Sequence, residues 1–362
     1  MVYGPLAMKP RAVLEVLSGG AWASIQDLGR RGLRRAGVPW SGVFDVRLMR
    51  VANALAGNAE NTPVIECFDG GQQFRARGGR LRVALAGDAV LEIEHAGERR
   101  TVPAWRSLTL NDGEVLRLRA MRGGRIAMLA VAGIELPCTL GSASTYVRAA
   151  LGGIGGAALA SGMELAAVLA SGGERVLPQP PTAVQAPIRA VAGPQREHFS
   201  AAALDLLWSA EFRVGAEADR MGIRLHGPQL PHCGAAEIVS DATVPGSIQV
   251  PGNGQPIVLL ADAQTAGGYP KIATVISADL GRLAAAPPGS VVRFAPVDAL
   301  AGEALARAAE AETRALIASI RSLPAEGVDL AALYAHNLVD GVVDARAPQS
   351  SSPAEGRGRA QT

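Results

Sequence analysis

The sequence predicts a mainly β protein with few helices. Glycine and proline are frequent, with 43 and 23 residues in a chain of 362, and turn-rich β structure is the usual globular use of such an excess. Short apolar runs bounded by Gly, Pro, Asn or Asp recur along the chain, whereas helical periodicity is sparse. With 48% hydrophobic residues, the chain is long enough to bury one large core or two ordinary ones.

The β signal consists of short apolar runs separated by turn residues. Asn111-Asp112-Gly113 lies between two of these runs and predicts a tight hairpin, because Asp-Gly tolerates the positive φ of such a turn. The runs are residues 12–17, 82–94, 107–110, 114–120, 125–131, 164–169, 188–191, 211–214, 222–225, 247–250, 257–261 and 291–294.

Three segments carry a helical pattern instead. Residues 43–56 place Phe44, Leu48 and Val51 at the spacing of one buried helix face. A shorter pattern covers residues 200–208. Residues 298–323 are rich in Ala, Glu, Arg and Leu and predict a C-terminal helix that packs on a barrel or on a partner.

Composition divides the chain at a proline-rich segment. Residues 177–187 contain four prolines between two β-rich blocks, which predicts a linker. We therefore expect an N-terminal β-rich domain over residues 11–180 and a second β domain over residues 188–297, followed by the helix of residues 298–323. Residues 346–362 are poor in apolar side chains and predict a disordered tail.

Charge and hydropathy exclude several classes of partner. The formal net charge is +2, so no large field of one sign attracts nucleic acid or anionic lipid. The longest uncharged stretches are interrupted by polar residues and glycine, and no secretory signal precedes residue 11, so we expect no membrane span. The cysteines Cys67, Cys138 and Cys233 lie far apart, which fits a reducing compartment. We therefore expect a cytoplasmic protein with a small-molecule or protein partner.

Several familiar cofactor sites are absent from the sequence. Neither of the two lysines lies in a P-loop, G-x-S-x-G does not occur, and the five histidines lack metal-ligand spacing. Residues 153–158 match a dinucleotide-binding pattern but do not follow a strand, so a flexible loop is the better interpretation. We expect no metal site and no nucleotide site on this chain.

The most informative segment follows the apolar strand of residues 257–261. The strand leads through Asp262 to a glycine turn that ends at Lys271, and such a turn is a suitable ligand wall. Asp262 can accept a hydrogen bond from a ring N–H or a water, and Lys271 can neutralise a carboxylate or a phosphate. Only two of the 35 basic residues are lysines, which favours a requirement for an ammonium at Lys271. A surface loop with a solvated lysine has equal weight.

Two neighbouring segments add polar side chains. Ser247 and Gln249 share one face of a predicted strand and can bind an amide, although a solvent-facing strand edge is slightly favoured. Arg220 and Arg224 fall on one side of another strand, with Gly222 between them, and suit a carboxylate or phosphate. Ion pairing of these arginines to Asp219 or Glu217 competes with that interpretation.

The N-terminal block contributes a helix face and a buried acid. Asp45 and Asn53 are eight residues apart on the predicted helix and share its polar face. Glu66 lies on a strand face with Val64 and Phe68, where burial raises the pKa of a carboxyl or demands an arginine partner. Structural pairing of Glu66 with an arginine is the favoured interpretation.

Several long motifs together carry a family resemblance. On these stretches, from about residue 13 to residue 294, the chain resembles the biotin-dependent carboxyltransferase-like family, which includes the C subunit of bacterial ATP-hydrolysing 5-oxoprolinase, the antagonist of the sporulation-kinase inhibitor, and the second allophanate-hydrolase-type region of urea carboxylases. The stretches are residues 24–30, 37–39, 41–42 with Asp45, 52–53, 57–58, 219–222, 224–225, 246–252, 254–257, 262–265 and 267–271.

The resemblance implies two cyclophilin-like β-barrel domains and a role in opening the lactam of 5-oxo-L-proline to L-glutamate, together with an A subunit and a kinase-inhibitor-like B subunit. The complex uses ATP, and no cofactor is bound covalently to this chain. Asp262 and Lys271 are then the expected catalytic residues, and Lys271, Arg220 and Arg224 neutralise anions. The other expected substrate-binding residues are Ser247, Gln249, Gln264, Thr265, Gly267, Gly268, Tyr269, Asp45 and Asn53.

Departures from the family pattern keep two alternatives open. Ala266 stands where family members usually have threonine, and Ala157 and Met163 stand where relatives often have Arg and Asp. One alternative is a carboxyltransferase component that acts on urea or a related amide, with biotin carried on another chain. The other is a non-enzymatic antagonist of a kinase-inhibitor-like partner.

Overall fold

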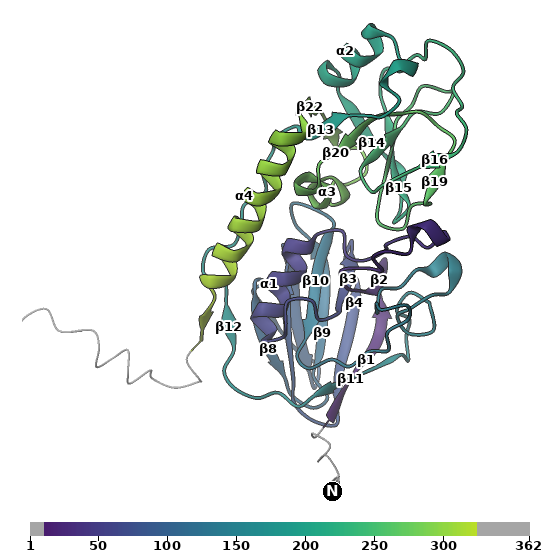
Figure 1. Cartoon of the computed structure of the whole chain (residues 1–362). Coiled ribbons are helices and arrows are strands. Elements are labelled where there is room, and N and C mark those ends of the chain that lie inside the picture. The colour runs from purple at the N-terminus through teal and green to yellow at the C-terminus, as the bar shows by residue number, and fades with distance from the viewer. Residues whose placement is uncertain (1–10, 324–362) are drawn as a thin grey trace, which may run out of the picture. The chain divides into compact units, whose positions relative to one another are not determined.

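Two antiparallel β-sheets face each other in the N-terminal part of the computed structural model, which describes residues 11–323 (Figure 1). Leu14 and Phe74 from the first sheet and Ile65 and Leu85 from the second share one buried core. The six-stranded sheet has the order β11 (Glu164–Val168), β1 (Arg11–Gly19), β4 (Gln72–Arg77), β9 (Val115–Met121), β6 (Ala89–His95) and β7 (Glu98–Val102). The seven-stranded sheet has the order β2 (Trp22–Gln26), β3 (Val64–Phe68), β10 (Ile126–Val131), β5 (Leu81–Ala86), β8 (Arg106–Leu110), β12 (Arg175–Val176) and β23 (Arg321–Ser322).

The C-terminal sheet is nearly closed on itself. Its two edge strands, β21 and β22, are separated in sequence by Arg293 alone, so the sheet must curl until its edges approach each other. Its order is β21 (Val291–Val292), β14 (Phe212–Ala218), β15 (Gly222–His226), β18 (Ile257–Leu259), β17 (Ser247–Gln249), β20 (Lys271–Val275), β13 (Ile188–Ala192) and β22 (Phe294–Pro296). A separate two-stranded pair, β16 (Asp241–Ala242) and β19 (Ala266–Gly267), lies beside it (Figure 1). The predicted mainly β class is confirmed.

Four α-helices complete the described residues: α1 (Val46–Ala56), α2 (Ala201–Ser209), α3 (Ser277–Ala284) and α4 (Ala299–Ala318). Three short 3₁₀ turns are η1 (Arg34–Ala36), η2 (Val147–Ala149) and η3 (Arg196–His198). The first helix begins later than its apolar pattern predicts, because Asp45 adopts extended backbone and its carboxylate accepts a hydrogen bond from the Leu48 N–H at 3.0 Å. Such an N-cap satisfies a backbone donor that the first helical turn leaves free.

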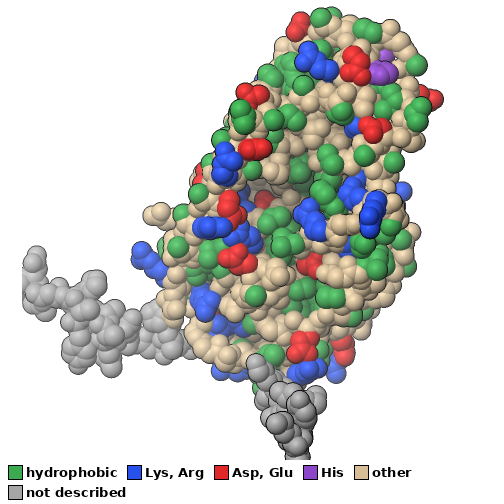
Figure 2. Space-filling model, in the orientation of Figure 1, with side chains coloured by type: hydrophobic (Ala, Val, Ile, Leu, Met, Phe, Trp, Pro, Cys, Tyr) green, Lys and Arg blue, Asp and Glu red, His purple; other side chains and the backbone are tan. Residues whose placement is uncertain are grey.

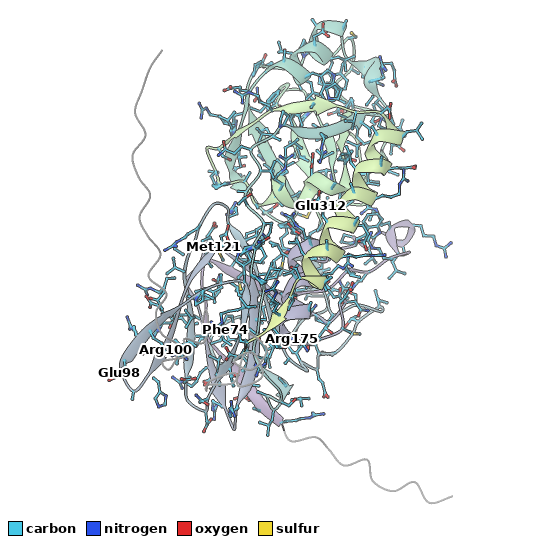
Figure 3. All side chains as sticks on the ribbon, turned by 90° about the vertical axis from the view of Figure 1, so that its left-hand side faces the viewer. Phe74, Glu98, Arg100, Met121, Arg175 and Glu312 are labelled. Atoms are coloured by element: carbon cyan, nitrogen blue, oxygen red, sulfur yellow. The ribbon has the colours of Figure 1, made fainter. Side chains whose placement is uncertain are left out.

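α1 and α4 connect the sheets. The buried side chains of Met49 and Leu55 belong to the same core cluster as Phe212 and Ile248 of the C-terminal sheet. Arg50 on α1 pairs with Glu310 on α4 at 2.6 Å. The predicted C-terminal helix ends at Ala318, and the next residues form β23 on the edge of the seven-stranded sheet. Figure 3, in which Glu312 marks α4 and Arg175 marks β12, shows this end of the helix leading into the sheet edge.

Two local predictions from the sequence are wrong. Gly113 has the expected positive φ of 84°, but the strands on either side of the turn do not form a hairpin, since β8 lies in the seven-stranded sheet and β9 in the six-stranded sheet. The turn therefore connects the two sheets. The run of residues 82–94 contains two strands, β5 and β6, which also lie in different sheets.

The predicted domain boundary falls between β12 and β13. Residues 11–323 belong to one compact unit, and the division into two domains stays a prediction. The predicted tail, residues 346–362, lies outside the described residues. Within residues 11–323, no helix combines the length and the apolar character that a membrane crossing requires.

Candidate functional site

A cavity of about 340 Å³ lies where the β2–β3 edge meets the turn between β14 and β15. Four aromatic side chains line it: Trp22, Phe44, Phe68 and Tyr146. Six charged side chains join them: Asp69, Arg125, Arg148, Asp219, Arg220 and Asp262. A half-open cavity with an apolar wall and a few charged groups is typical of a small-molecule site.

Arg220 is the central side chain of the cavity floor. Its Nε donates to Asp262 at 2.9 Å, and its Nη1 forms an ion pair with Glu66. Its Nη2 donates to the Gly42 carbonyl at 2.6 Å, and the guanidinium lies 4.7 Å from the centre of the Phe44 ring. Arg220 is only 7% exposed and Glu66 is fully buried. The contacts of the Arg220 guanidinium therefore replace nearly all of the hydrogen bonds that it would make with water.

The charges in this cluster do not balance. Two carboxylates, Glu66 and Asp262, surround one guanidinium. Burial raises the pKa of Glu66, and the charge of Arg220 and the Phe44 N–H oppose that rise without cancelling it. Burial acts to lower the pKa of Arg220. The two carboxylates raise that pKa by more than burial lowers it, so the guanidinium stays protonated. The cluster is therefore suited to take up a proton or to bind an N–H group of a ligand.

The sequence around Arg220 forms a tight turn that fixes its position. The Asp219 carboxylate accepts hydrogen bonds from the Met221 N–H at 2.8 Å and the Gly222 N–H at 3.2 Å. A side chain at Gly222 would place its Cβ 2.8 Å from the Val258 carbonyl oxygen, so only glycine lets the turn lie against β18. The Asp262 N–H donates to the Arg220 carbonyl at 2.9 Å. Backbone contacts thus hold both charged residues in place.

Trp22, Arg125 and Arg148 of the cavity lining differ in how their nitrogen donors are partnered. The indole Nε1 of Trp22 is buried and donates to no protein acceptor within residues 11–323. Farther out, Arg125 pairs with Asp69 at 2.6 Å, and the exposed Arg148 lies 3.5 Å from Asp219.

The prediction that Arg220 and Arg224 lie on the same side of one strand is wrong. Arg220 lies in the turn before β15 and is buried, whereas Arg224 lies within β15 and is exposed. Arg224 pairs with Glu217 at 3.1 Å, the structural alternative that the sequence left open. The prediction assumed that side chains alternate between the two faces of a strand from Arg220 onward. The strand begins only at Gly222, so Arg220 is not part of it.

Lys271 lies in a second polar cluster. It is buried at the start of β20, and its Nζ contacts the Asp241 carboxylate at 2.8 Å. Gln195 Nε2 donates to the same carboxylate at 2.9 Å. These hydrogen bonds, chiefly the one from Lys271, lower the pKa of Asp241. Because the side chain of Asp241 is 49% exposed, the cluster is open to solvent on that side.

Amide side chains extend this second cluster. Gln249 lies opposite Lys271 on β17, and its Oε1 accepts from Gln264 Nε2 at 3.3 Å. A Cβ at Gly267 would lie 2.5 Å from Gln249 Nε2, so glycine is required for this approach. Lys271, Gln249 and Gln264 do not line the cavity around Arg220. The structure therefore separates the predicted site into an Arg220–Asp262 part and a Lys271 part.

Comparisons with known proteins place the chain in a family. The model of the carboxyltransferase domain, subdomain A and B, matches residues 36–296. The chain belongs to this carboxyltransferase-domain family. It is 34% identical to the 5-oxoprolinase C subunit of Escherichia coli over 296 residues, which cover 78% of this chain and 90% of that protein. It is 37% identical to the 5-oxoprolinase C subunit of Haemophilus influenzae over 292 residues, which cover 79% of this chain and 91% of that protein.

A solved structure of the family has the same fold. The crystal structure of the Kluyveromyces lactis urea carboxylase matches 88% of this chain with a TM-score of 0.75 and 25% sequence identity. The match covers only 30% of that longer chain. The mainly β architecture of this chain is thus shared with one region of a urea carboxylase.

Three of the family-like stretches meet at the cavity floor. Gly42, Arg220 and Asp262 each belong to a different stretch of the sequence, and the hydrogen bonds of Arg220 bring them together. Other residues of the family-like stretches lie away from the cavity floor and form hydrogen bonds within the protein. Ser247 is buried, and its Oγ accepts from the Val244 N–H at 3.1 Å. The backbone carbonyls of Thr265 and Gly268 accept hydrogen bonds from Thr243 and Ile238.

The expectation of a polar face shared by Asp45 and Asn53 is wrong. Asn53 is fully buried and donates to the carbonyls of Thr62 at 2.7 Å and Glu60 at 3.2 Å. Asp45 lies before the helix as its cap. Tyr269 is 39% exposed and does not line the cavity.

Sequence reasoning missed several residues of this site. Glu66 was expected to pair with an arginine, which is confirmed, but it was not placed among the functional residues. A glutamate inside the apolar strand Val64–Phe68 was the available signal. Trp22, Tyr146 and Arg148 carry no comparable signal, because they reach the cavity only through the tertiary fold. Among the side chains of residues 11–323, no group of three or more His, Cys, Asp and Glu could hold a metal ion.

Proposed function

We propose that this chain is the C subunit of an ATP-dependent 5-oxoprolinase complex, which opens the lactam of 5-oxo-L-proline to L-glutamate together with the A and B subunits. The observation that carries the proposal is the buried Glu66–Arg220–Asp262 cluster on the floor of an aromatic cavity. The 34% and 37% identical relatives, matched over about nine tenths of their length, support it.

The cavity offers complementary groups for several parts of a lactam acid. The ring N–H can donate to Asp262, whose carboxylate is held on the floor by Arg220. The lactam ring can pack against the aromatic side chains of Trp22 and Phe44, which line the cavity. The ligand carboxylate can pair with Arg148, whose contact to Asp219 at 3.5 Å is long and exposed. One cavity thus offers an apolar wall for the ring, an acceptor for its N–H and a cation for its carboxylate.

The chemistry of ring opening explains why the charge cluster matters. Water adds to the carbonyl carbon, the C–N bond breaks, and the ring nitrogen must gain a proton as it leaves. An unactivated lactam resists attack, and ATP supplies the activation by phosphorylating the carbonyl oxygen with release of ADP. Ring opening then leaves an acyl phosphate, which a second water hydrolyses to the free carboxylate and inorganic phosphate. Glu66, whose pKa is raised by burial, shares the Arg220 cation with Asp262 and can hold the proton that the leaving nitrogen requires. The aromatic walls exclude bulk water from this step.

Lys271 has a separate part in the proposal. Its buried ammonium neutralises a carboxylate or phosphate that replaces the exposed Asp241, while Gln249 and Gln264 orient the same group. In the proposal, the anion takes the position beside Lys271 Nζ at which the structure has the Asp241 carboxylate. The exchange costs little because Asp241 is returned to water.

A second candidate is the carboxyltransferase component of an enzyme that acts on urea or a related amide. The family model and the shared fold with a urea carboxylase favour it. That reaction depends on biotin carried by another chain. The same floor would then receive a urea N–H at Asp262.

The deciding experiment measures 5-oxoproline-dependent ADP release by the chain alone, and by the chain mixed with the A and B subunits. Release in the full mixture alone is the expected result, and no release from a formed complex would reject the proposal. Asp262→Asn is expected to lower turnover by about a hundredfold or more, with Arg100→Ala on exposed β7 as a control. Complex formation and circular dichroism establish that each variant is folded. Carboxyl transfer from carboxybiotin to urea would favour the second candidate.

A further inference from the structure

Four arginines lie in the turn that leads into η1 and in η1 itself. Arg30, Arg31, Arg34 and Arg35 fall in six consecutive residues, and Trp40 follows them. We call these five residues the arginine patch. Whereas arginines such as Arg99 and Arg293 form salt bridges, none of the four does so within residues 11–323. The patch therefore concentrates positive charge in a chain whose formal net charge is only +2.

Neutral carbonyl groups hold two of these guanidinium groups. Arg30 Nε donates to the Thr139 carbonyl at 3.1 Å, and its Nη2 also contacts the carbonyl of Ser144. Arg34 Nη2 donates to the carbonyl oxygens of Thr243 at 2.6 Å and Gln264 at 3.2 Å. Carbonyl dipoles orient a guanidinium but leave its charge in place.

Nearby acidic groups do not neutralise the patch. Asp27 and Asp262 act on Arg30 only through space, and burial still lowers the pKa of Arg30. Asp27 is occupied by the Ser142 hydroxyl at 2.5 Å and the Ala143 N–H at 2.7 Å. The Nη1 atoms of Arg30 and Arg34 are buried, and neither has an acceptor in the part of the chain that the structure describes. The positive potential is therefore available to a group outside the chain.

The outer side chains are exposed and partly ordered. Arg31 and Arg35 are exposed, and the Arg31 guanidinium lies 4.3 Å from the centre of the Trp40 ring, with Arg34 at 5.4 Å from the same ring. Figure 2 shows Lys and Arg side chains gathered on the right-hand side, at the height where the dark purple turn lies in Figure 1. Stacking on Trp40 reduces the entropy that Arg31 loses when it binds a partner.

The shape of the patch favours a macromolecule over a small anion. None of its residues lines the cavity, and small ligands bind in concave sites. Arginine and tryptophan are enriched among the residues that dominate protein interfaces. A carboxylate-rich surface supplies the bidentate acceptors that a guanidinium pairs with.

We propose that the arginine patch docks an acidic surface segment of another protein of the complex, with Arg31 and Arg35 as the contacting cations. This inference rests on the proposed function, because it requires that the chain works in a complex with other subunits. Arg30 and Arg34 hold the turn in place and raise its potential. Docking there is separate from the chemistry at Arg220.

The test compares two double variants with the same change in charge. Arg31→Glu/Arg35→Glu reverses the patch, and Arg80→Glu/Arg100→Glu reverses two exposed arginines that form no salt bridge within residues 11–323. Binding of each chain to the separate A and B subunits is measured by titration at low and high salt. The patch variant is expected to weaken binding to one of the two by about tenfold or more and to reduce the salt dependence, whereas the control binds like the wild type.

Three outcomes decide the inference. Selective loss of binding in the patch variant supports it. Equal binding by both double variants, or equal loss in both, overturns the docking inference. In that case, 5-oxoproline-dependent ADP release by the wild-type mixture still supports the proposed function. Failure of the wild-type chain to bind either of the other subunits overturns the proposed function, and the docking surface with it.

Discussion

Arg220 and Lys271 are both buried cations, but the structure holds them in opposite ways. Arg220 lies between two buried carboxylates, Glu66 and Asp262. Lys271 has one carboxylate partner within the described residues, Asp241, and that partner is half exposed. The first cation is fixed by charges that cannot return to water, whereas the second can exchange its partner. Burial of the partner, more than burial of the cation, decides whether a charge pair is permanent.

The largest effect is expected from removing the cation on the cavity floor. Arg220→Met leaves Glu66 and Asp262 buried without a counter-ion, so the free energy of unfolding should fall by about 3–5 kcal/mol. Urea denaturation measures this loss, and Arg224→Met, at an exposed position of β15, serves as the matched control. A loss below about 1 kcal/mol would mean that the cluster is hydrated or protonated and does not behave as a fixed ion pair.

The pH dependence of stability tests the excess charge on the floor. Burial raises the pKa of Glu66, so the stability this group contributes is present below its ordinary pKa and is lost as pH rises through the raised value. Glu66→Gln lacks this titration. The stability of the wild type relative to Glu66→Gln should therefore fall as pH rises above the ordinary pKa of a glutamate carboxyl, measured by urea midpoints. A rise over that range would contradict the charge assignment.

A smaller effect on stability is expected at the second cluster. Lys271→Met keeps the length and volume of the side chain and frees an exposed carboxylate, so the loss should be at most about 1.5 kcal/mol. Turnover in the assembled complex is nevertheless expected to fall, because the anion loses its counter-ion. Unchanged turnover would remove Lys271 from the mechanism.

The Lys271 pair also has a pH dependence of opposite sign. Its hydrogen bonds lower the pKa of Asp241, so the stability that Asp241 contributes is present above its ordinary pKa and is lost as pH falls. Lys271→Met should reduce that acid-side loss, because Lys271 is the main cause of the lowered pKa. Comparison of urea midpoints between about pH 5 and pH 3 measures it, and the two clusters are then distinguished by the direction of their titrations.

The smallest effect is expected at Arg224. Its pair with Glu217 is exposed on both sides, with 54% and 81% of the side chains accessible. Arg224→Ala should change the free energy of unfolding by no more than about 0.5 kcal/mol. A larger loss would mean that β15 depends on this residue in a way that its contacts do not explain.

The sequence predicted local structure well where local chemistry decides it. The apolar runs predicted most of the central strands, and the turn at Gly113 has its expected φ. The partners of the strands were not predictable, because the choice between two sheets depends on contacts far along the chain. β8 and β9, joined by that turn, belong to different sheets for this reason.

The site was predicted in part for the same physical reason. An acid in an apolar strand required a cation, and Glu66 has one, but the sequence contains many arginines and does not specify Arg220, which lies 154 residues away. Asp262 and Lys271 lie in one segment of the sequence, yet they serve different clusters. Proximity along the chain was mistaken for proximity in space.

The last described strand has a consequence for how the chain folds during synthesis. β23 pairs with β12 on the edge of the N-terminal seven-stranded sheet, although its residues follow the whole C-terminal sheet. A ribosome must therefore translate residues 321–322 before the first sheet has its final edge. Until then, the open edge offers unpaired backbone groups to other chains. A nascent chain stalled before α4 would for this reason be more prone to aggregate than the finished protein.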